Sequence, residues 1–127
     1  MMRLNQWQVL VVEDEADSME VVQGILEHAG INCIPAMTAE DALHILQNTV
    51  PTLIIVDLAL PGMDGWGLLN ELQADHRLVA VPRVAITAYH TLELADKALQ
   101  AGFDAYFPKP IEATSFVSDL QGIVEDE

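Results

Sequence analysis

Residues 53–65, with the sequence LIIVDLALPGMDG, constrain the fold of this chain more than any other stretch. The first four residues are apolar and three of them are β-branched, which is typical of a strand buried on both faces of a parallel sheet. Asp57 follows this run directly, and a proline–glycine pair then indicates a loop before a helix that starts near Asp64. Because reactive groups of open α/β sheets lie at the carboxyl ends of the strands, Asp57 is a candidate reactive group. An aspartate in this place can also serve only to cap the loop.

The same succession, a short apolar run followed by a polar group, recurs along the chain. We predict strands at residues 9–12, 31–35, 53–56, 81–87 and 105–107. Apolar residues at helical spacing lie between these runs and predict helices at 16–29, from Thr38, from about Asp64, at 92–101 and at about 112–124.

Five strands that alternate with five helices predict an α/β fold. The parallel sheet is covered by helices on both faces, through right-handed crossovers. A length of 127 residues fits one domain, covering residues 1–127. An apolar fraction of 51% supports a packed core and argues against disorder.

The charge of the chain limits its partners. Five basic and twenty acidic residues give a net charge of −15, which argues against direct binding to nucleic acid or to an anionic membrane. We find no signal peptide and no apolar run of the about 18 residues that a membrane span needs. Cys33 is the single cysteine, which excludes an intramolecular disulfide and fits a reducing compartment. We therefore expect a cytoplasmic protein in which this thiol is buried.

The polar groups that follow the predicted strands form the candidate site. Because parallel strands end at the same edge of a sheet, residues that are distant in the sequence can meet there. These residues are Glu13, Asp14, Asp57, Thr87 and Lys109. Carboxylates that lie close together repel one another, and a hard divalent cation such as Mg²⁺ relieves this repulsion because it prefers oxygen ligands.

Phosphoryl transfer suits this set of side chains. Asp57 can act as a nucleophile toward phosphorus and form an aspartyl-phosphate. Lys109 can pair with Asp57 or with a phosphate on it, and Thr87 can donate a hydrogen bond to a phosphoryl oxygen. Such a reaction needs mainly positioning and neutralisation of charge, which these groups supply.

Four short motifs carry a resemblance to a known family. They are VVEDE at 11–15, DLALPGMDG at 57–65, AITAY at 85–89 and FDAYFPKP at 103–110. In their order and spacing the chain resembles the receiver domain of response regulators in two-component signalling, as a stand-alone, chemotaxis-type regulator. The resemblance implies a flavodoxin-like, doubly wound sheet with strand order 2-1-3-4-5 and a domain core at about 8–124.

The resemblance also implies the role of each site residue. Asp57 would accept a phosphoryl group from a sensor histidine kinase or a phosphotransfer protein. Mg²⁺ would be held by Glu13, Asp14, Asp57 and the backbone carbonyl of Ala59. Thr87 and Lys109 would bind the phosphoryl oxygens, and the Lys109–Pro110 peptide bond would be cis. Tyr106 would turn inward when Thr87 moves toward the phosphoryl group, and a downstream target protein would read this switch.

Ala59 and Tyr89 occupy the positions that flank the path of the hydrolytic water in receivers. Ala59 has no side chain with which to orient that water, and Tyr89 is bulky enough to shield the phosphoryl group. We therefore predict slow self-dephosphorylation.

Three other readings of the sequence remain open. The chain can be a pseudo-receiver that acts as a constitutive scaffold, although such scaffolds usually lose one or more of the five site residues. It can also be a receiver excised from a larger regulator or hybrid kinase. An aspartyl-phosphate phosphatase ranks last, because Ala59 stands where those enzymes carry a second aspartate. We expect no enzymatic turnover beyond self-phosphorylation and self-dephosphorylation.

Overall fold

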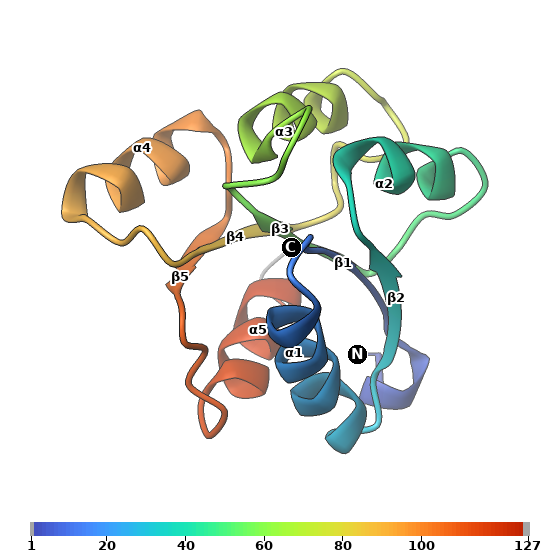
Figure 1. Ribbon diagram of the computed structural model, residues 1–127. Helices are drawn as coiled ribbons and strands as arrows, with labels where there is room; N and C mark the ends of the chain where they lie inside the picture. Colours follow the sequence, from blue (N-terminus) through green and yellow to red (C-terminus); the bar gives the residue numbers. More distant parts are fainter. Residues whose placement is uncertain (1, 126–127) are drawn as a thin grey trace.

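A parallel sheet of five strands forms the centre of the computed structural model, which describes residues 2–125 (Figure 1). The strands are β1 (Gln8–Val12), β2 (Asn32–Ala36), β3 (Leu53–Asp57), β4 (Arg83–Thr87) and β5 (Ala105–Pro108). Their order in the sheet is β2-β1-β3-β4-β5, and every neighbouring pair is parallel. This confirms the predicted α/β fold and its strand order.

Helices cover both faces of the sheet, as Figure 1 shows. On one face lie α1 (Ala16–His28) and α5 (Phe116–Glu125), and on the other lie α2 (Ala39–Leu46), α3 (Gly65–Gln73) and α4 (Leu92–Ala101). A short 3₁₀ helix, η1 (Leu4–Gln6), precedes β1. None of the helices in the described part of the chain is long and apolar enough to cross a membrane.

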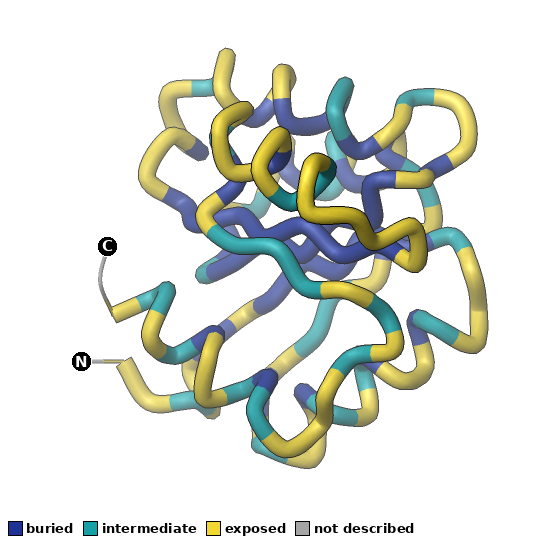
Figure 2. The backbone as a smooth tube through the Cα atoms, turned by 90° about the vertical axis from the view of Figure 1, so that its left-hand side faces the viewer, coloured by how far each residue is buried: buried dark blue, intermediate teal, exposed yellow. Residues whose placement is uncertain are grey.

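The sheet divides the hydrophobic core in two, because successive residues of a strand point to opposite faces. Leu10, Val12, Ile54 and Val56 pack on the side of α2, α3 and α4. Val9, Val11, Leu53 and Ile55 pack on the side of α1 and α5. Figure 2 shows the strands as the buried centre of the molecule and exposed residues along the outer helices and loops.

α4 has fewer buried residues than any other α-helix in the described part of the chain. Ala98 is its only buried residue among those described. Trp66 of α3 also touches α4, since the Lys97 Nζ lies 4.7 Å from the centre of its ring. Leu94 is partly buried and packs against the same core, so α4 is held mainly by Leu94, Ala98 and Lys97.

Side chains cap three of the described helices, and at the start of α4 Thr91 accepts a hydrogen bond from the Leu94 N–H at 3.0 Å. Thr38 accepts a hydrogen bond from the Asp41 N–H at 3.0 Å at the start of α2. Asp64 accepts one from the Gly67 N–H at 2.9 Å at the start of α3. These caps satisfy N–H groups that have no partner within the helix.

Two predicted boundaries differ from the structure by two or more residues, and the others lie within one residue of it. The strand predicted from residue 81 begins at Arg83, because the Val81 N–H bonds to Leu78 O in a turn and residue 82 is a proline without an N–H. The helix predicted from residue 112 begins at Phe116, because Ser115 and Phe116 both donate to Glu112 O in a turn that precedes it.

Candidate functional site

Three neighbouring strands end at the candidate site. β1 runs into Glu13, while Asp57 and Thr87 are the last residues of β3 and β4. All three side chains are buried, with exposed fractions of 0%, 2% and 1%. The three strands are parallel and adjacent, so their last residues lie at the same edge of the sheet. Glu13 and Asp57 are 44 positions apart in the sequence, and Asp57 and Thr87 are 30 apart, yet the structure brings them together as their positions predict.

An acidic cluster at this edge is suited to a cation. One carboxylate oxygen each of Glu13, Asp14 and Asp57 lies within 4.8 Å of the others. The Ala59 N–H donates a hydrogen bond of 2.9 Å to Asp57 Oδ1, which holds the carboxylate and the start of the following loop together. Clustered oxygen donors of this kind fit Mg²⁺, which binds one or two carboxylates with water and phosphate oxygens.

Lys109 lies among these carboxylates. Its Nζ donates to Asp57 Oδ2 at 3.1 Å, to Glu13 Oε1, and to the Ser18 hydroxyl at 3.4 Å. Burial of the ammonium group opposes its charged form, but the hydrogen bonds to Glu13 and Asp57 outweigh this and raise the pKa of Lys109. The lysine is therefore a fixed positive charge beside Asp57.

Glu13 is a fully buried carboxylate beside Asp57 and Lys109. Burial, and next its hydrogen bond with Asp57, raise the pKa of Glu13 to about 7, although the Lys109 hydrogen bond lowers it. Burial disfavours a charged carboxylate, and a neighbouring carboxylate disfavours it further, so both act in the same direction on Glu13.

Thr87 is oriented by the backbone around it. Its hydroxyl oxygen accepts a hydrogen bond of 3.1 Å from the Tyr89 N–H, and its carbonyl accepts one of 2.9 Å from the Lys109 N–H. The first bond uses a lone pair of the hydroxyl and leaves its proton for another acceptor. Thr87 can thus donate to a group attached at Asp57.

Hydrogen bonds fix the loop between β3 and α3 at both ends and in its middle. Gly65 donates to Leu58 O at 3.2 Å, and a Cβ on Gly65 would lie 2.7 Å from the Asp57 carbonyl oxygen. Glu40 of α2 accepts a hydrogen bond of 3.3 Å from the Met63 N–H. The close approach at Gly65 explains why a residue without a side chain follows the loop.

Tyr106 and Tyr89 lie near this edge in different settings. Tyr106 is half-buried on β5, and burial raises the pKa of its hydroxyl. Its hydroxyl oxygen lies 3.1 Å from His90 Nδ1. Tyr89 is 73% exposed, so its role in shielding a phosphoryl group stays a prediction.

The Lys109–Pro110 peptide bond is cis, as expected.

Three contacts of the site could not be predicted from the sequence motifs. They involve Ser18 and Glu15, which lie 3.4 and 3.9 Å from Lys109 Nζ, and His90 beside Tyr106. Ser18 stands in the first turn of α1, four residues after Asp14, and this position is the only sequence signal for it.

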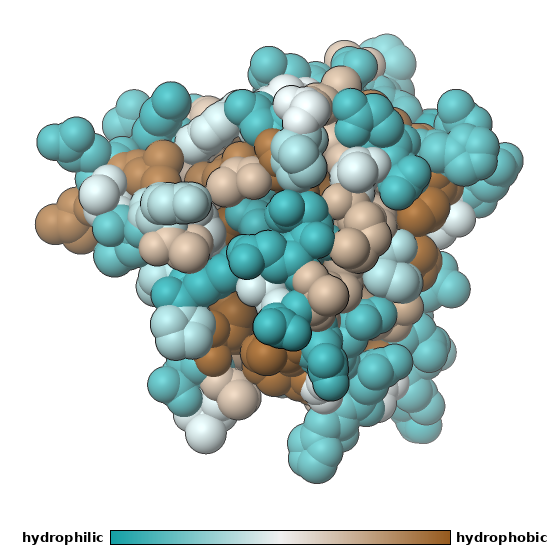
Figure 3. All heavy atoms as spheres, in the orientation of Figure 1, coloured by the Kyte–Doolittle hydropathy of each residue, from teal (hydrophilic) through white to brown (hydrophobic). Residues whose placement is uncertain are grey.

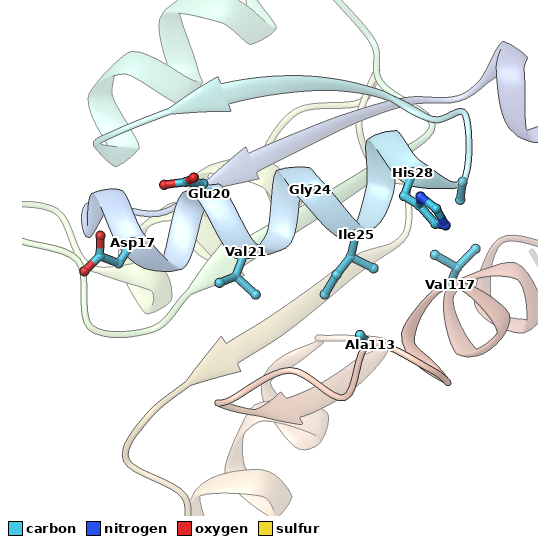
Figure 4. Close-up of a pocket in the computed structure, with 9 residues that line it drawn as sticks. Asp17, Glu20, Val21, Gly24, Ile25, His28, Ala113 and Val117 are labelled. Atoms are coloured by element: carbon cyan, nitrogen blue, oxygen red, sulfur yellow. The ribbon is translucent and has the colours of Figure 1, made fainter.

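A groove runs along α1 away from this edge, with a volume of about 900 Å³ (Figure 4). Val21, Ile25 and Val117 form its apolar lining, while Asp17 and Glu20 lie toward one end of α1. A smaller hollow beside it is lined in part by Lys109.

Figure 3, in the view of Figure 1, shows hydrophilic side chains in the middle of the face and hydrophobic ones below them.

Comparison with known proteins places this arrangement in a family. Residues 9–121 match the response regulator receiver domain. An uncharacterised 14.6 kDa protein of Leptolyngbya boryana is 32% identical over 121 residues, which are 95% of this chain and 92% of that protein. The polar-differentiation response regulator DivK of Brucella ovis is 28% identical over 118 residues, which are 93% of this chain and 96% of DivK.

A solved structure shows the same fold. It is a CheY-like response regulator receiver domain protein from Methanospirillum hungatei, with a TM-score of 0.84 and 27% sequence identity over 94% of each chain.

Proposed function

We propose a phospho-accepting role for this chain, which belongs to the family of response regulator receiver domains. Members of this family are signalling switches, generally not enzymes. In the proposed reaction, Asp57 receives a phosphoryl group from a phosphohistidine of a sensor histidine kinase or phosphotransfer protein. The observation that carries the proposal is the buried Asp57 carboxylate, which lies 3.1 Å from Lys109 Nζ and within the acidic cluster.

The chemistry assigns one task to each side chain. A bond forms between an Asp57 carboxylate oxygen and phosphorus, while the phosphorus–nitrogen bond to the donor histidine breaks and its electron pair stays on nitrogen. Lys109 offsets the negative charge that gathers on the phosphoryl oxygens, and the Thr87 hydroxyl donates a hydrogen bond to one of them.

Mg²⁺ is the proposed cofactor of this reaction. Glu13, Asp14, Asp57 and the Ala59 backbone carbonyl would hold it, and its charge would neutralise the phosphoryl oxygens when it is bound. Lys109 alone supplies one positive charge against three carboxylates, so the residues present fit an added cation.

The signal leaves through Thr87 and Tyr106 in this proposal. Thr87 moves toward the phosphoryl group, Tyr106 turns inward, and the surface of α4, β5 and α5 is presented to a downstream target protein. Phosphorylation thus acts as a local change of charge that biases a two-state element. We place the switch in the cytoplasm, where the unpaired Cys33 stays reduced.

Intact mass spectrometry tests the phospho-accepting role. The wild type is incubated with Mg²⁺ and acetyl phosphate, next to Asp57→Asn and to Asp41→Asn, which changes an exposed aspartate on α2. We expect one phosphoryl group on the wild type and on Asp41→Asn, and none on Asp57→Asn. A wild type that binds Mg²⁺ but gains no mass would favour a constitutive scaffold, and a gain on Asp57→Asn would move the acceptor elsewhere.

A further inference from the structure

His90 and Tyr106 form the contact from which we draw a further inference. His90 Nδ1 lies 3.1 Å from the Tyr106 hydroxyl oxygen. The two rings also pack against each other, with their centres 5.5 Å apart and their planes inclined by 36°. Either form of the imidazole can make this bond, since a bare Nδ1 accepts from the hydroxyl and a protonated Nδ1 donates to its oxygen.

The two residues sit on parts of the chain that are held differently. The Tyr106 backbone is part of β5, in register with Ala85 of β4. His90 lies in the loop between β4 and α4, three residues after Thr87. The same loop is bonded to the Thr87 hydroxyl through the Tyr89 N–H at 3.1 Å. A movement of Thr87 is therefore passed to the loop that carries His90, while the β5 backbone is held by the sheet.

We propose that His90 is a positioning residue that holds the Tyr106 side chain in its resting orientation. This inference rests on the proposed function, in which Thr87 moves toward a phosphoryl group. That movement draws the loop and His90 away from Tyr106, breaks the hydrogen bond and frees the tyrosine ring. The bond is thus the step that connects Thr87 to Tyr106.

A contact made only in the resting state must oppose any ligand that favours the switched state. Beryllofluoride, a non-covalent analogue of a phosphoryl group on an aspartate, is such a ligand. Loss of the contact should tighten the apparent binding of beryllofluoride, measured with Mg²⁺. We expect a change of about three- to tenfold, the range to which a typical neutral hydrogen bond corresponds.

Binding is measured for the wild type, His90→Ala, Tyr106→Phe and the double variant. Both single variants should bind beryllofluoride more tightly, and the double variant no more tightly than the better single one, because both changes remove the same bond. His90→Gln, which keeps a polar group, should lie nearer the wild type. His76→Ala, in the loop between α3 and β4, is the matched control and should leave binding unchanged.

Fluorine NMR supplies an independent readout, because the chain has only two tyrosines. Protein labelled with 3-fluorotyrosine should give two resonances, assigned with Tyr89→Phe and Tyr106→Phe. In ligand-free His90→Ala the Tyr106 resonance should move part of the way toward its position in the beryllofluoride complex of the wild type. The Tyr89 resonance should stay closer to its wild-type position.

Two results would overturn the role of His90. One is a His90→Ala variant that binds beryllofluoride as the wild type does or more weakly. The other is a double variant whose effect is the product of the two single ones. A wild type that fails to bind beryllofluoride would count against the phospho-accepting role instead. In that case the ligand-free fluorine spectrum alone tests whether His90 positions the Tyr106 side chain. An unchanged Tyr106 resonance in His90→Ala would disprove that role.

Discussion

Lys109 Nζ lies 3.1 Å from Asp57 Oδ2 and also donates to Glu13, so one ammonium group serves two buried carboxylates. Replacing Lys109 with Met keeps the length of the side chain and removes its charge. We expect the rate of phosphorylation by acetyl phosphate to fall about 100-fold, in line with the loss of one preorganised donor at a reacting oxyanion. The rate is followed by intact mass.

Lys97→Met is the matched control for this change, because Lys97 is the other lysine of the chain and lies over the Trp66 ring. It should phosphorylate at the wild-type rate. Equal losses in both variants would show that charge in general, and not the position of Lys109, sets the rate.

Gly65→Ala should damage the site through the backbone. The new Cβ would lie 2.7 Å from both the Asp57 carbonyl oxygen and the Leu58 Cα, so β3 or α3 must shift. We expect the free energy of unfolding, measured with urea, to fall by about 1–3 kcal/mol. Gly122→Ala in α5 is the control, because its Cβ meets nothing within 4 Å, and it should stabilise the helix by about 0.5–1 kcal/mol.

The lifetime of the phosphorylated form should be long, because Ala59 presents no polar side chain to a hydrolytic water. Its N–H is already bonded to Asp57 Oδ1. Ala59→Asn should shorten the lifetime severalfold, and the decay of the phosphorylated mass after removal of the donor measures it. A wild-type half-life of seconds would contradict the prediction.

Cys33 should make stability depend on pH in the alkaline range. Its thiol is half-buried, and burial raises its pKa to about 11, although a hydrogen bond with Gln23 lowers it. The ordinary pKa of a cysteine thiol is about 8.5. Between these values the unfolded chain has lost a proton that the folded chain keeps, so stability is full below about pH 8.5 and falls as the pH rises toward 11.

Urea unfolding of the wild type and Cys33→Ala at several pH values between 8 and 10.5 measures this effect. Tyrosines and lysines titrate in both proteins, so the difference in slope isolates the thiol. The wild type should lose stability more steeply with pH than Cys33→Ala, and equal slopes would rule out the shifted thiol.

The strand ends were predictable because the sheet is parallel. An apolar run followed by a polar group places Glu13, Asp57 and Thr87 at one edge whatever the details of the loops. Boundaries set by turns were less visible, as at residues 112–115, which form a turn ahead of the true start of α5 at Phe116. The His90 contact depends on the path of a loop, and no periodic pattern reports such a path.

The single buried residue of α4 in the described chain has a consequence for the order in which parts of the molecule unfold locally. Segments with few buried apolar contacts open locally at a lower free energy than the strands of a core. Ala98 is the only buried residue described in α4, whereas every residue of β3 is buried. Backbone amides of α4 should therefore take up deuterium well before those of β3, while the sheet that holds Asp57 stays closed.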